Sequence, residues 1–307
     1  MKIVRRKKSV SKRKSHELSE AEQLKLRLQH LDQHIERDNY ADDIICEETE
    51  APYVRATEFK DILKGNLFKY KSSGALDFGI VMHEAFEEYL TTGLTTQFML
   101  KTVAKALDAD KKDNVVSLVG ENNAKATAVF SAFKKFVDTK GLNEKVNLVE
   151  PAFVVPLSLM KKRLKGKKFW GTPLLKFFSD NKLSIKINPD FLICKEDGTL
   201  AIVDWKTTSR TALNDVCWDM QSFGQKFSLL YHAVGLEALG ATVSQFDLLY
   251  LPKKADNPNG RCVHLQAAGP RVDTFAKYIE EYLSKCQDFQ NKKKAYHSED
   301  AVTFGVL

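Results

Sequence analysis

Two carboxylates and a lysine lie at the adjacent ends of two predicted strands. Asp190 follows a proline and precedes an apolar run, whereas Asp204 and Lys206 end the next apolar run along the chain. The intervening residues 195–198, Lys-Glu-Asp-Gly, are typical of a hairpin turn. Side chains two residues apart on a strand point to the same face, so we expect Asp204 and Lys206 to project together, close to Asp190.

This grouping predicts a ligand site, because ionised groups resist burial unless they are paired or bind something. Two neighbouring carboxylates are natural oxygen ligands for Mg²⁺ or Mn²⁺. Lys206 could then orient or deprotonate a metal-bound water while the metal stabilises charge on a scissile phosphate. The acid-x-Lys spacing also occurs elsewhere, but only this pair ends an apolar strand. The alternative is a buried Asp–Lys ion pair that closes the hairpin.

The same residues resemble a known nuclease motif. Pro-Asp at 189–190, thirteen intervening residues and Asp-Trp-Lys at 204–206 are similar to the PD-(D/E)XK nuclease superfamily, and specifically to its RecB-like exonuclease branch. This branch includes bacterial recombination nucleases, many phage exonucleases and the mitochondrial genome-maintenance exonuclease. The resemblance covers roughly residues 54–289. It implies a restriction-endonuclease-like fold, with a central mixed β-sheet flanked by helices, and phosphodiester hydrolysis by two-metal-type activation of water.

The resemblance also assigns roles to individual residues. Gly79 and His83 match the Gly-x-x-x-His pattern that the family carries on an N-terminal helix. The family pattern implies that Lys206 serves the catalytic water together with the two acids. It also implies that Mg²⁺ or Mn²⁺ is held by His83, Asp190, Asp204 and the backbone carbonyl of Trp205.

Three further residues are candidates for accessory roles. Glu150 occupies a place comparable to that of a glutamate on the first core strand of the family, with a solvated strand-end acid as the alternative. The family's Gln-x-x-x-Tyr motif is incomplete here, because Phe227 stands four residues before Tyr231. Gln225 lies on a polar face of the same predicted helix and could substitute. The alternatives are a surface amide for Gln225 and a packed aromatic for Tyr231.

The expected elements describe an α/β (α+β) protein with a mixed sheet flanked by helices. A capping box at Ser19 and Glu22 begins one amphipathic helix. Further helices are expected over 57–64, 76–90, 96–107, 122–139, 213–239 and 272–289, and strands over 146–157, 183–194, 200–206, 244–251 and 261–267. We divide the chain into a disordered basic arm (1–18), a helix with an acidic linker (19–52), a nuclease domain (53–295) and a C-terminal tail (296–307).

The composition is that of a soluble globular chain. With 307 residues, 43% hydrophobic and 28% charged, it excludes collagen and full disorder. No apolar run approaches the roughly 20 residues that span a bilayer, and no signal peptide is recognisable, so we expect no membrane partner. A cytoplasmic location is expected in a bacterial or phage-infected cell, or the nucleus or organelle matrix in a eukaryote. Five scattered cysteines without a C-x-x-C pair favour neither a disulfide framework, nor zinc, nor an iron–sulfur cluster.

The net charge of +7 is unevenly distributed. Residues 1–14 carry eight basic and no acidic side chains, and residues 160–182 carry eight basic and one acidic, so the remainder has a net charge of −8. Both segments favour contact with a polyanion, although a solubilising tail, a nuclear-localisation signal and a solvated loop are alternatives. We interpret 160–182 as a basic insert. The expected DNA-binding residues are Arg5, Arg6, Lys7, Lys8, Lys161, Lys162, Arg163, Lys165, Lys167, Lys168 and Trp170.

Together these features predict a metal-dependent DNA exonuclease in recombination, repair, replication or phage DNA processing. Its partner would be DNA, as single strands or duplex ends, with recombination or replication proteins as further partners. One alternative is a non-catalytic DNA-binding scaffold on a degenerate nuclease fold, motivated by Phe227. Another is a structure-specific endonuclease.

Overall fold

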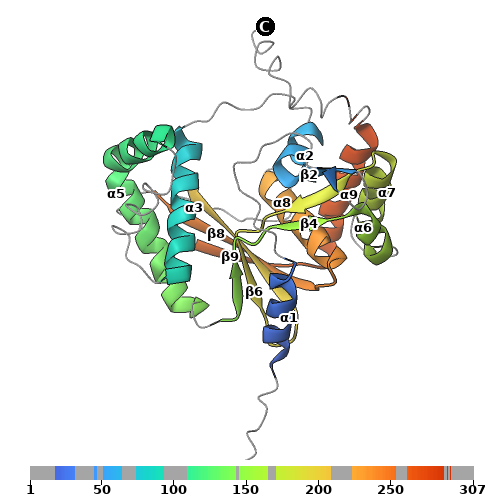
Figure 1. Cartoon of the computed structure of the whole chain (residues 1–307), viewed down its shortest axis with the longest axis horizontal. Helices are drawn as coiled ribbons and strands as arrows, with labels where there is room; N and C mark the ends of the chain where they lie inside the picture. The colour runs from blue at the N-terminus through green and yellow to red at the C-terminus, as the bar shows by residue number, and fades with distance from the viewer. Residues whose placement is uncertain are drawn as a thin grey trace, which may run out of the picture.

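The computed structural model shows a mixed α/β protein in which helices surround two mixed sheets (Figure 1). The α/β (α+β) class is therefore confirmed. The structure describes residues 18–31, 45–46, 51–63, 74–92, 109–142, 145–164, 171–208, 223–253, 261–286, 289 and 291. The predicted helix at 96–107, residues 1–17 of the predicted arm (1–18) and the tail at 296–307 lie outside these residues. No described helix is long and apolar enough to cross a membrane.

The larger sheet contains the predicted hairpin. Its five strands have the order β3 (Asn147–Val149), β6 (Phe191–Cys194), β7 (Leu200–Thr208), β8 (Val243–Pro252) and β9 (Arg261–Gln266). β6 and β7 pair antiparallel, and Gly198 takes the positive φ of 72° that their turn requires. β8 lies parallel to β7, which is possible because α8 (Phe223–Ala238) is the crossover between them.

The structure also contains a second, four-stranded sheet, and two of the expected strands are each divided between the two sheets. Its order is β1 (Ile45–Cys46), β2 (Ala51–Arg55), β5 (Ser184–Ile187) and β4 (Phe153–Val155). The run predicted as one strand over 146–157 is split into β3 and β4, and the run over 183–194 into β5 and β6. Glu150 at φ 41° and Pro189, which has no N–H to donate, stand at the two breaks. The strands therefore form two sheets rather than one.

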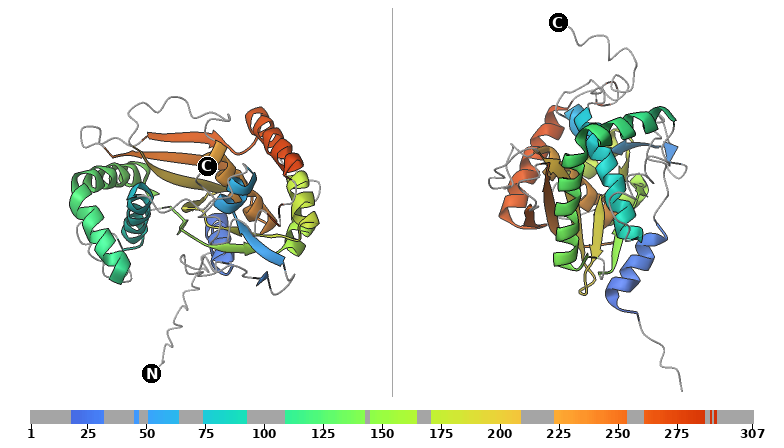
Figure 2. Two further views of the ribbon diagram at one scale, coloured as in Figure 1. Left: turned by 90° about the horizontal axis from the view of Figure 1, so that it is seen from above. Right: turned by 90° about the vertical axis from the view of Figure 1, so that its left-hand side faces the viewer.

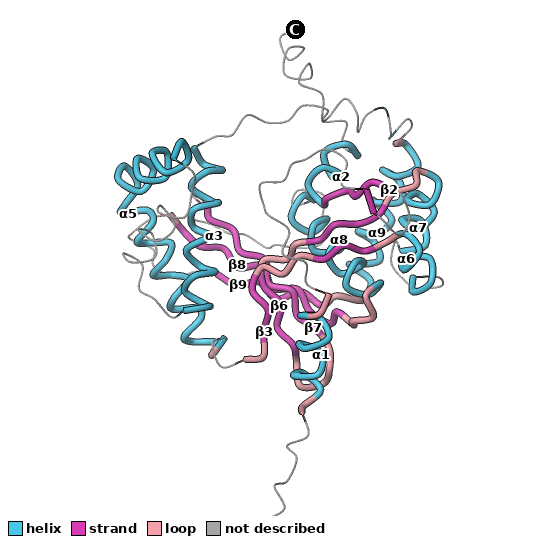
Figure 3. The backbone as a smooth tube through the Cα atoms, in the orientation of Figure 1, coloured by secondary structure: helices cyan, strands magenta, loops and turns pink. Residues whose placement is uncertain are grey.

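Helices cover both faces of the larger sheet (Figures 2 and 3). α3 (Gly74–Thr92) and α5 (Ala109–Lys140) lie on one face, over a core that includes Phe86, Phe133 and Trp205. α8 lies on the other, where a second core continues into the smaller sheet. The remaining helices are α1 (Glu20–Gln29), α2 (Ala56–Leu63), α6 (Leu157–Leu164), α7 (Gly171–Asp180) and α9 (Pro270–Lys285).

The N-terminal helix α1 belongs to this second core. Ser19 and Glu22 form the predicted capping box, with each residue bonded to the other's backbone N–H. Leu24 and Leu28 are buried together with side chains of the sheets. Residues before position 53 therefore contribute to the same core as the residues that follow.

The described parts of the predicted basic insert at 160–182 are mainly helical. Residues 157–164 and 171–180 are α6 and α7, and Met160, Leu164 and Phe178 are almost fully buried. Apolar side chains recur here at the spacing of a helix that packs one face inwards. α6 and α7 therefore contribute to the core. Lys165, Lys167, Lys168 and Trp170 lie outside the described residues.

Candidate functional site

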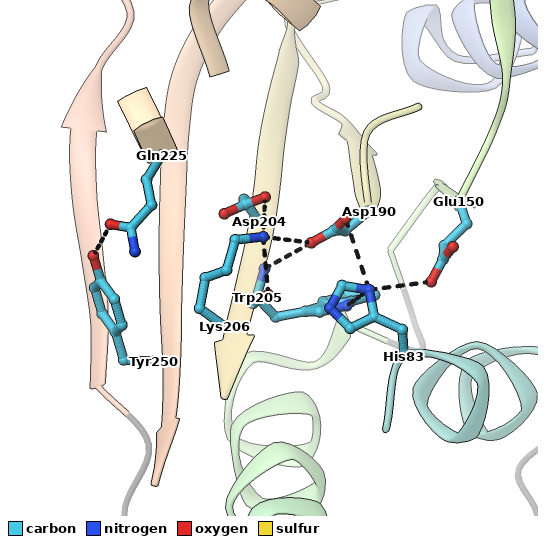
Figure 4. A network of polar contacts seen from close by, with 8 residues as sticks. All are labelled: His83, Glu150, Asp190, Asp204, Trp205, Lys206, Gln225 and Tyr250. Atoms are coloured by element: carbon cyan, nitrogen blue, oxygen red, sulfur yellow. Dashed lines mark hydrogen bonds and ion pairs between the residues drawn. The ribbon is translucent and has the colours of Figure 1, made fainter. Parts of the chain in front are cut away.

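The hairpin positions Asp190 against β7 at the point where strand pairing ends (Figure 4). Phe191 opposite Val203 is the last pair of the β6–β7 ladder. Two residues further along β7, the backbone N–H of Trp205 donates to Asp190 Oδ2 at 3.0 Å. The carboxylate thus replaces the strand partner that β6 no longer supplies, and it is held where β7 continues beyond its pairing with β6.

Lys206 joins the two acids. Its Nζ lies 2.8 Å from Asp204 Oδ1 and 3.7 Å from Asp190 Oδ2. It also donates to the backbone carbonyl of Trp205 at 3.3 Å. The prediction that Asp204 and Lys206 project to the same face is confirmed, and the predicted acids and lysine meet in one cluster.

Burial and charge act in opposite directions on these groups. Burial raises the pKa of Asp204, and nearby Asp190 adds to the rise while Lys206 opposes it. Burial alone would lower the pKa of Lys206, but the two carboxylates outweigh it and hold that pKa above its ordinary value. Lys206 is therefore an ammonium group that donates hydrogen bonds in this arrangement.

His83 reaches the cluster from α3. Its Nδ1 lies 3.7 Å from Glu150 Oε1 and 3.9 Å from Asp190 Oδ1, and it accepts a 3.1 Å hydrogen bond from the indole N–H of Trp205. Burial lowers the pKa of His83, but Asp190 and Glu150 raise it above its ordinary value. The indole fixes the ring orientation. A metal ion bound to His83 Nδ1 would require the indole N–H of Trp205 to donate to another acceptor.

Glu150 is part of the cluster rather than a solvated strand-end acid. Its φ of 41° is in the left-handed region that few non-glycine residues adopt. In this conformation its backbone N–H donates to the carbonyl of Asp190 at 2.9 Å. Its side chain is 13% exposed and directed towards His83. The break between β3 and β4 therefore brings a third carboxylate to the site.

Gln225 is connected to the cluster by Tyr250, a residue that the sequence analysis did not identify. Tyr250 stands opposite Lys206 in the parallel register of β7 and β8, and its hydroxyl donates to Gln225 Oε1 at 2.7 Å. His232, which shares the polar face of α8 with Gln225, also interacts with the cluster. Burial lowers its pKa to about 4, although the nearby Asp204 carboxylate opposes this shift. The available signals were a hydroxyl-bearing side chain in an apolar strand for Tyr250, and the polar face of α8 for His232.

Tyr231 is not at the cluster, which corrects its predicted accessory role. Its hydroxyl donates to the backbone carbonyl of Val54 at 2.5 Å. Its ring packs against Phe59, Phe178 and Phe227 in the second core. The packed-aromatic alternative is the one that the structure shows, and Phe227 belongs to the same aromatic group.

The donor set suits a hard divalent cation. Asp204 Oδ2 is buried and has no hydrogen-bond partner among the residues that the structure describes. Such an atom costs free energy unless something binds to it. Carboxylate oxygens with a carbonyl and an imidazole are ligands that Mg²⁺ or Mn²⁺ accepts. The structure brings together His83, Glu150, Asp190, Asp204, Trp205 and Lys206.

The basic residues that we expected to bind DNA do not lie at the cluster where the structure describes them. Lys161, Lys162 and Arg163 are exposed in the last turn of α6. α6 and α7 lie on the side of the molecule opposite α3, which carries His83 (Figure 1). Arg5, Arg6, Lys7 and Lys8 fall outside the described residues. The expectation that these groups bind DNA stays a prediction.

Neither a scan of protein-family models nor a search of curated proteins found a match to this sequence. The geometry of the cluster is therefore what supports a function.

Proposed function

We propose that this protein is a metal-dependent deoxyribonuclease of the PD-(D/E)XK, RecB-like kind, on a restriction-endonuclease-like fold, that degrades DNA from an end. One observation carries the proposal: Lys206 lies between Asp190 and Asp204 at the end of an apolar hairpin. Side chains from two other parts of the chain, His83 and Glu150, complete the group.

The carboxylates of Asp190, Asp204 and Glu150 would hold Mg²⁺ or Mn²⁺. His83 and the carbonyl of Trp205 are further candidate ligands. When bound there, the metal supplies Lewis-acid stabilisation of charge on the phosphate and lowers the pKa of water. The buried Asp204 Oδ2, which has no hydrogen-bond partner among the described residues, is an acceptor that a cation would satisfy.

The chain's own groups have separable tasks. Lys206 is 37% exposed, so its ammonium can reach a phosphate oxygen while remaining beside Asp204. The backbone N–H of Trp205 holds Asp190, and its indole orients His83. The acids repel a phosphate diester unless cations neutralise them, so substrate approach and cation binding are expected to be linked.

A time course on end-labelled single-stranded and duplex DNA with Mg²⁺ tests this proposal. We expect Asp204→Asn and Lys206→Ala to slow cleavage by about a thousand-fold or more, because several kcal/mol of transition-state stabilisation would be lost. Asp180→Asn is a matched control, since Asp180 is an exposed acid of the same acid-x-Lys spacing on α7. Folded Asp204→Asn protein that digests DNA at the wild-type rate would refute the assignment.

Two further measurements separate the alternatives. Covalently closed circular DNA stays intact with an obligate exonuclease, whereas cleavage of circles indicates an endonuclease. Retention of DNA without cleavage in Mg²⁺ or Mn²⁺, together with no divalent-cation binding by calorimetry, would indicate a DNA-binding scaffold instead.

A further inference from the structure

A second group of metal-binding side chains lies at the other edge of the larger sheet. Cys262 and His264 are two residues apart on β9 and therefore share a face. Asp247 on β8 stands directly opposite His264 in the antiparallel register. One ligand atom from each of these three residues lies within 4.8 Å of the others. Strand pairing thus brings a carboxylate, a thiol and an imidazole together.

A neighbouring side chain holds Asp247 in place, and an open pocket adjoins the trio. Gln245 Nε2 donates to Asp247 Oδ1 at 2.7 Å, which fixes a carboxylate that is 7% exposed. Supporting hydrogen bonds of this kind are typical of metal ligands. A pocket of about 300 Å³ opens beside the trio, between α5 and β9. It is lined by Ala132, Lys135, Phe136, Thr139, Lys140, Cys262 and His264.

We propose that Asp247, Cys262 and His264 bind Zn²⁺, at a site separate from the carboxylate cluster. The three residues supply one sulfur, one nitrogen and one oxygen, a set that suits zinc rather than magnesium. Three protein ligands leave a fourth position open, and the adjoining pocket provides room there for water. The sequence contained no C-x-x-C pair, so only the strand register reveals this set.

The geometry requires a small adjustment before a cation can enter. His264 Nδ1 lies 2.6 Å from Asp247 Oδ1, which is a hydrogen-bond distance. Ligand atoms on a tetrahedral zinc ion are roughly 3.3–3.8 Å apart, given bonds of about 2.0–2.3 Å. His264 is the group that can move, because its side chain is 51% exposed whereas Asp247 is held by Gln245. A simple His–Asp hydrogen bond is the competing interpretation.

Zinc bound by these three residues would stabilise the edge strand β9. β9 is the last strand of the sheet and pairs only with β8 among the described strands. A cation shared between β8 and β9 would add a cross-strand link that the unfolded chain lacks, so it would raise the stability of the folded state by mass action. This role is independent of nuclease activity.

Cobalt substitution of the full chain provides the test. Reduced, chelator-treated protein is titrated with Co²⁺, and we expect the near-ultraviolet charge-transfer absorption of a thiolate–cobalt bond. Cys262→Ser should abolish this absorption, whereas Cys286→Ser, a control at another partly exposed cysteine, should keep it. Wild-type protein without the band, or a band that persists in Cys262→Ser, would overturn the proposal.

A second measurement covers the case in which Cys262→Ser does not fold. Zn²⁺ affinity is measured by competition with a chromophoric chelator for wild type and His264→Gln, a substitution at an exposed position. We expect the affinity to fall by at least about tenfold. Equal affinities would show that the His–Asp hydrogen bond is structural only. Carrying out both titrations in the Asp204→Asn protein excludes zinc bound at the carboxylate cluster.

Discussion

Replacing Asp204 by asparagine should separate the function of the carboxylate cluster from the stability of the fold. Asp204 is 6% exposed, and its Oδ2 has no hydrogen-bond partner among the described residues. Asparagine has nearly the same shape but carries no charge. We therefore expect Asp204→Asn to lose cleavage activity and to retain, or slightly gain, stability.

The magnitude follows from two opposing contributions. A buried polar group without a partner costs about 1–3 kcal/mol, so removing the charge relieves part of that cost. The ion pair with Lys206 is lost, but Lys206 is partly exposed and still has Asp190 at 3.7 Å, so this loss is about 1 kcal/mol or less. The free energy of unfolding should thus change by between 0 and about +2 kcal/mol.

Urea unfolding, with and without Mg²⁺, measures the change in stability and the loss of cation binding. Mg²⁺ should raise the free energy of unfolding of the wild type, because it binds the folded state, and should leave that of Asp204→Asn unchanged. Asp180→Asn, at an exposed carboxylate, should respond to Mg²⁺ as the wild type does. A variant that is destabilised by more than 2 kcal/mol, or that still responds fully to Mg²⁺, would refute the reasoning.

Four other substitutions test parts of the fold that surround the site. Gly235→Ala places a Cβ 2.7 Å from Ile187 Cδ1 and should lower the free energy of unfolding by about 1–3 kcal/mol. Gly79→Ala, which meets nothing within 4 Å, should raise it by about 0.5–1 kcal/mol, and urea unfolding compares the two. Burial lowers the pKa of Lys186 from 10.5 to about 8, so the folded state binds fewer protons than the unfolded state between these values. Wild-type stability should therefore gain a favourable contribution as pH rises from 8 to 10.5, and Lys186→Met should remove it in pH-dependent unfolding. Tyr231→Phe should lower stability by about 1 kcal/mol through loss of a hydrogen bond to a backbone carbonyl, while the DNA cleavage rate stays unchanged.

The central hairpin could be predicted because its signals are local. The turn at 195–198 and the two-residue period of a strand were enough to place Asp204 and Lys206 on one face and Asp190 beside them. Glu150 and His83 could be named only through a family resemblance, since no local pattern shows that distant segments meet. The structure brings both to the cluster.

Two kinds of feature could not be predicted in this way: contacts that depend on the register between strands, and helices whose apolar spacing is masked by a high density of charge. The basic charge of 160–182 concealed the helical spacing of Met160 and Leu164, so the two core helices in this segment were not predicted. Tyr250 reaches the site because β8 lies parallel to β7 in one particular register, which a long crossover through α8 does not reveal. The trio around Cys262 depends on the register of β8 and β9 in the same way.

Trp205 explains how one small cluster can remain ordered at the end of a strand. Its backbone N–H holds Asp190, its carbonyl accepts from Lys206, and its indole N–H holds His83. The indole ring is 1% exposed and packs edge-on against Phe86 and Phe133 from the two helices on that face. Because one buried residue connects the hairpin, the lysine and α3 through its backbone and its side chain, the positions of the acids are coupled to the packing of the aromatic core. The precision of the site therefore depends on residues that never contact a substrate.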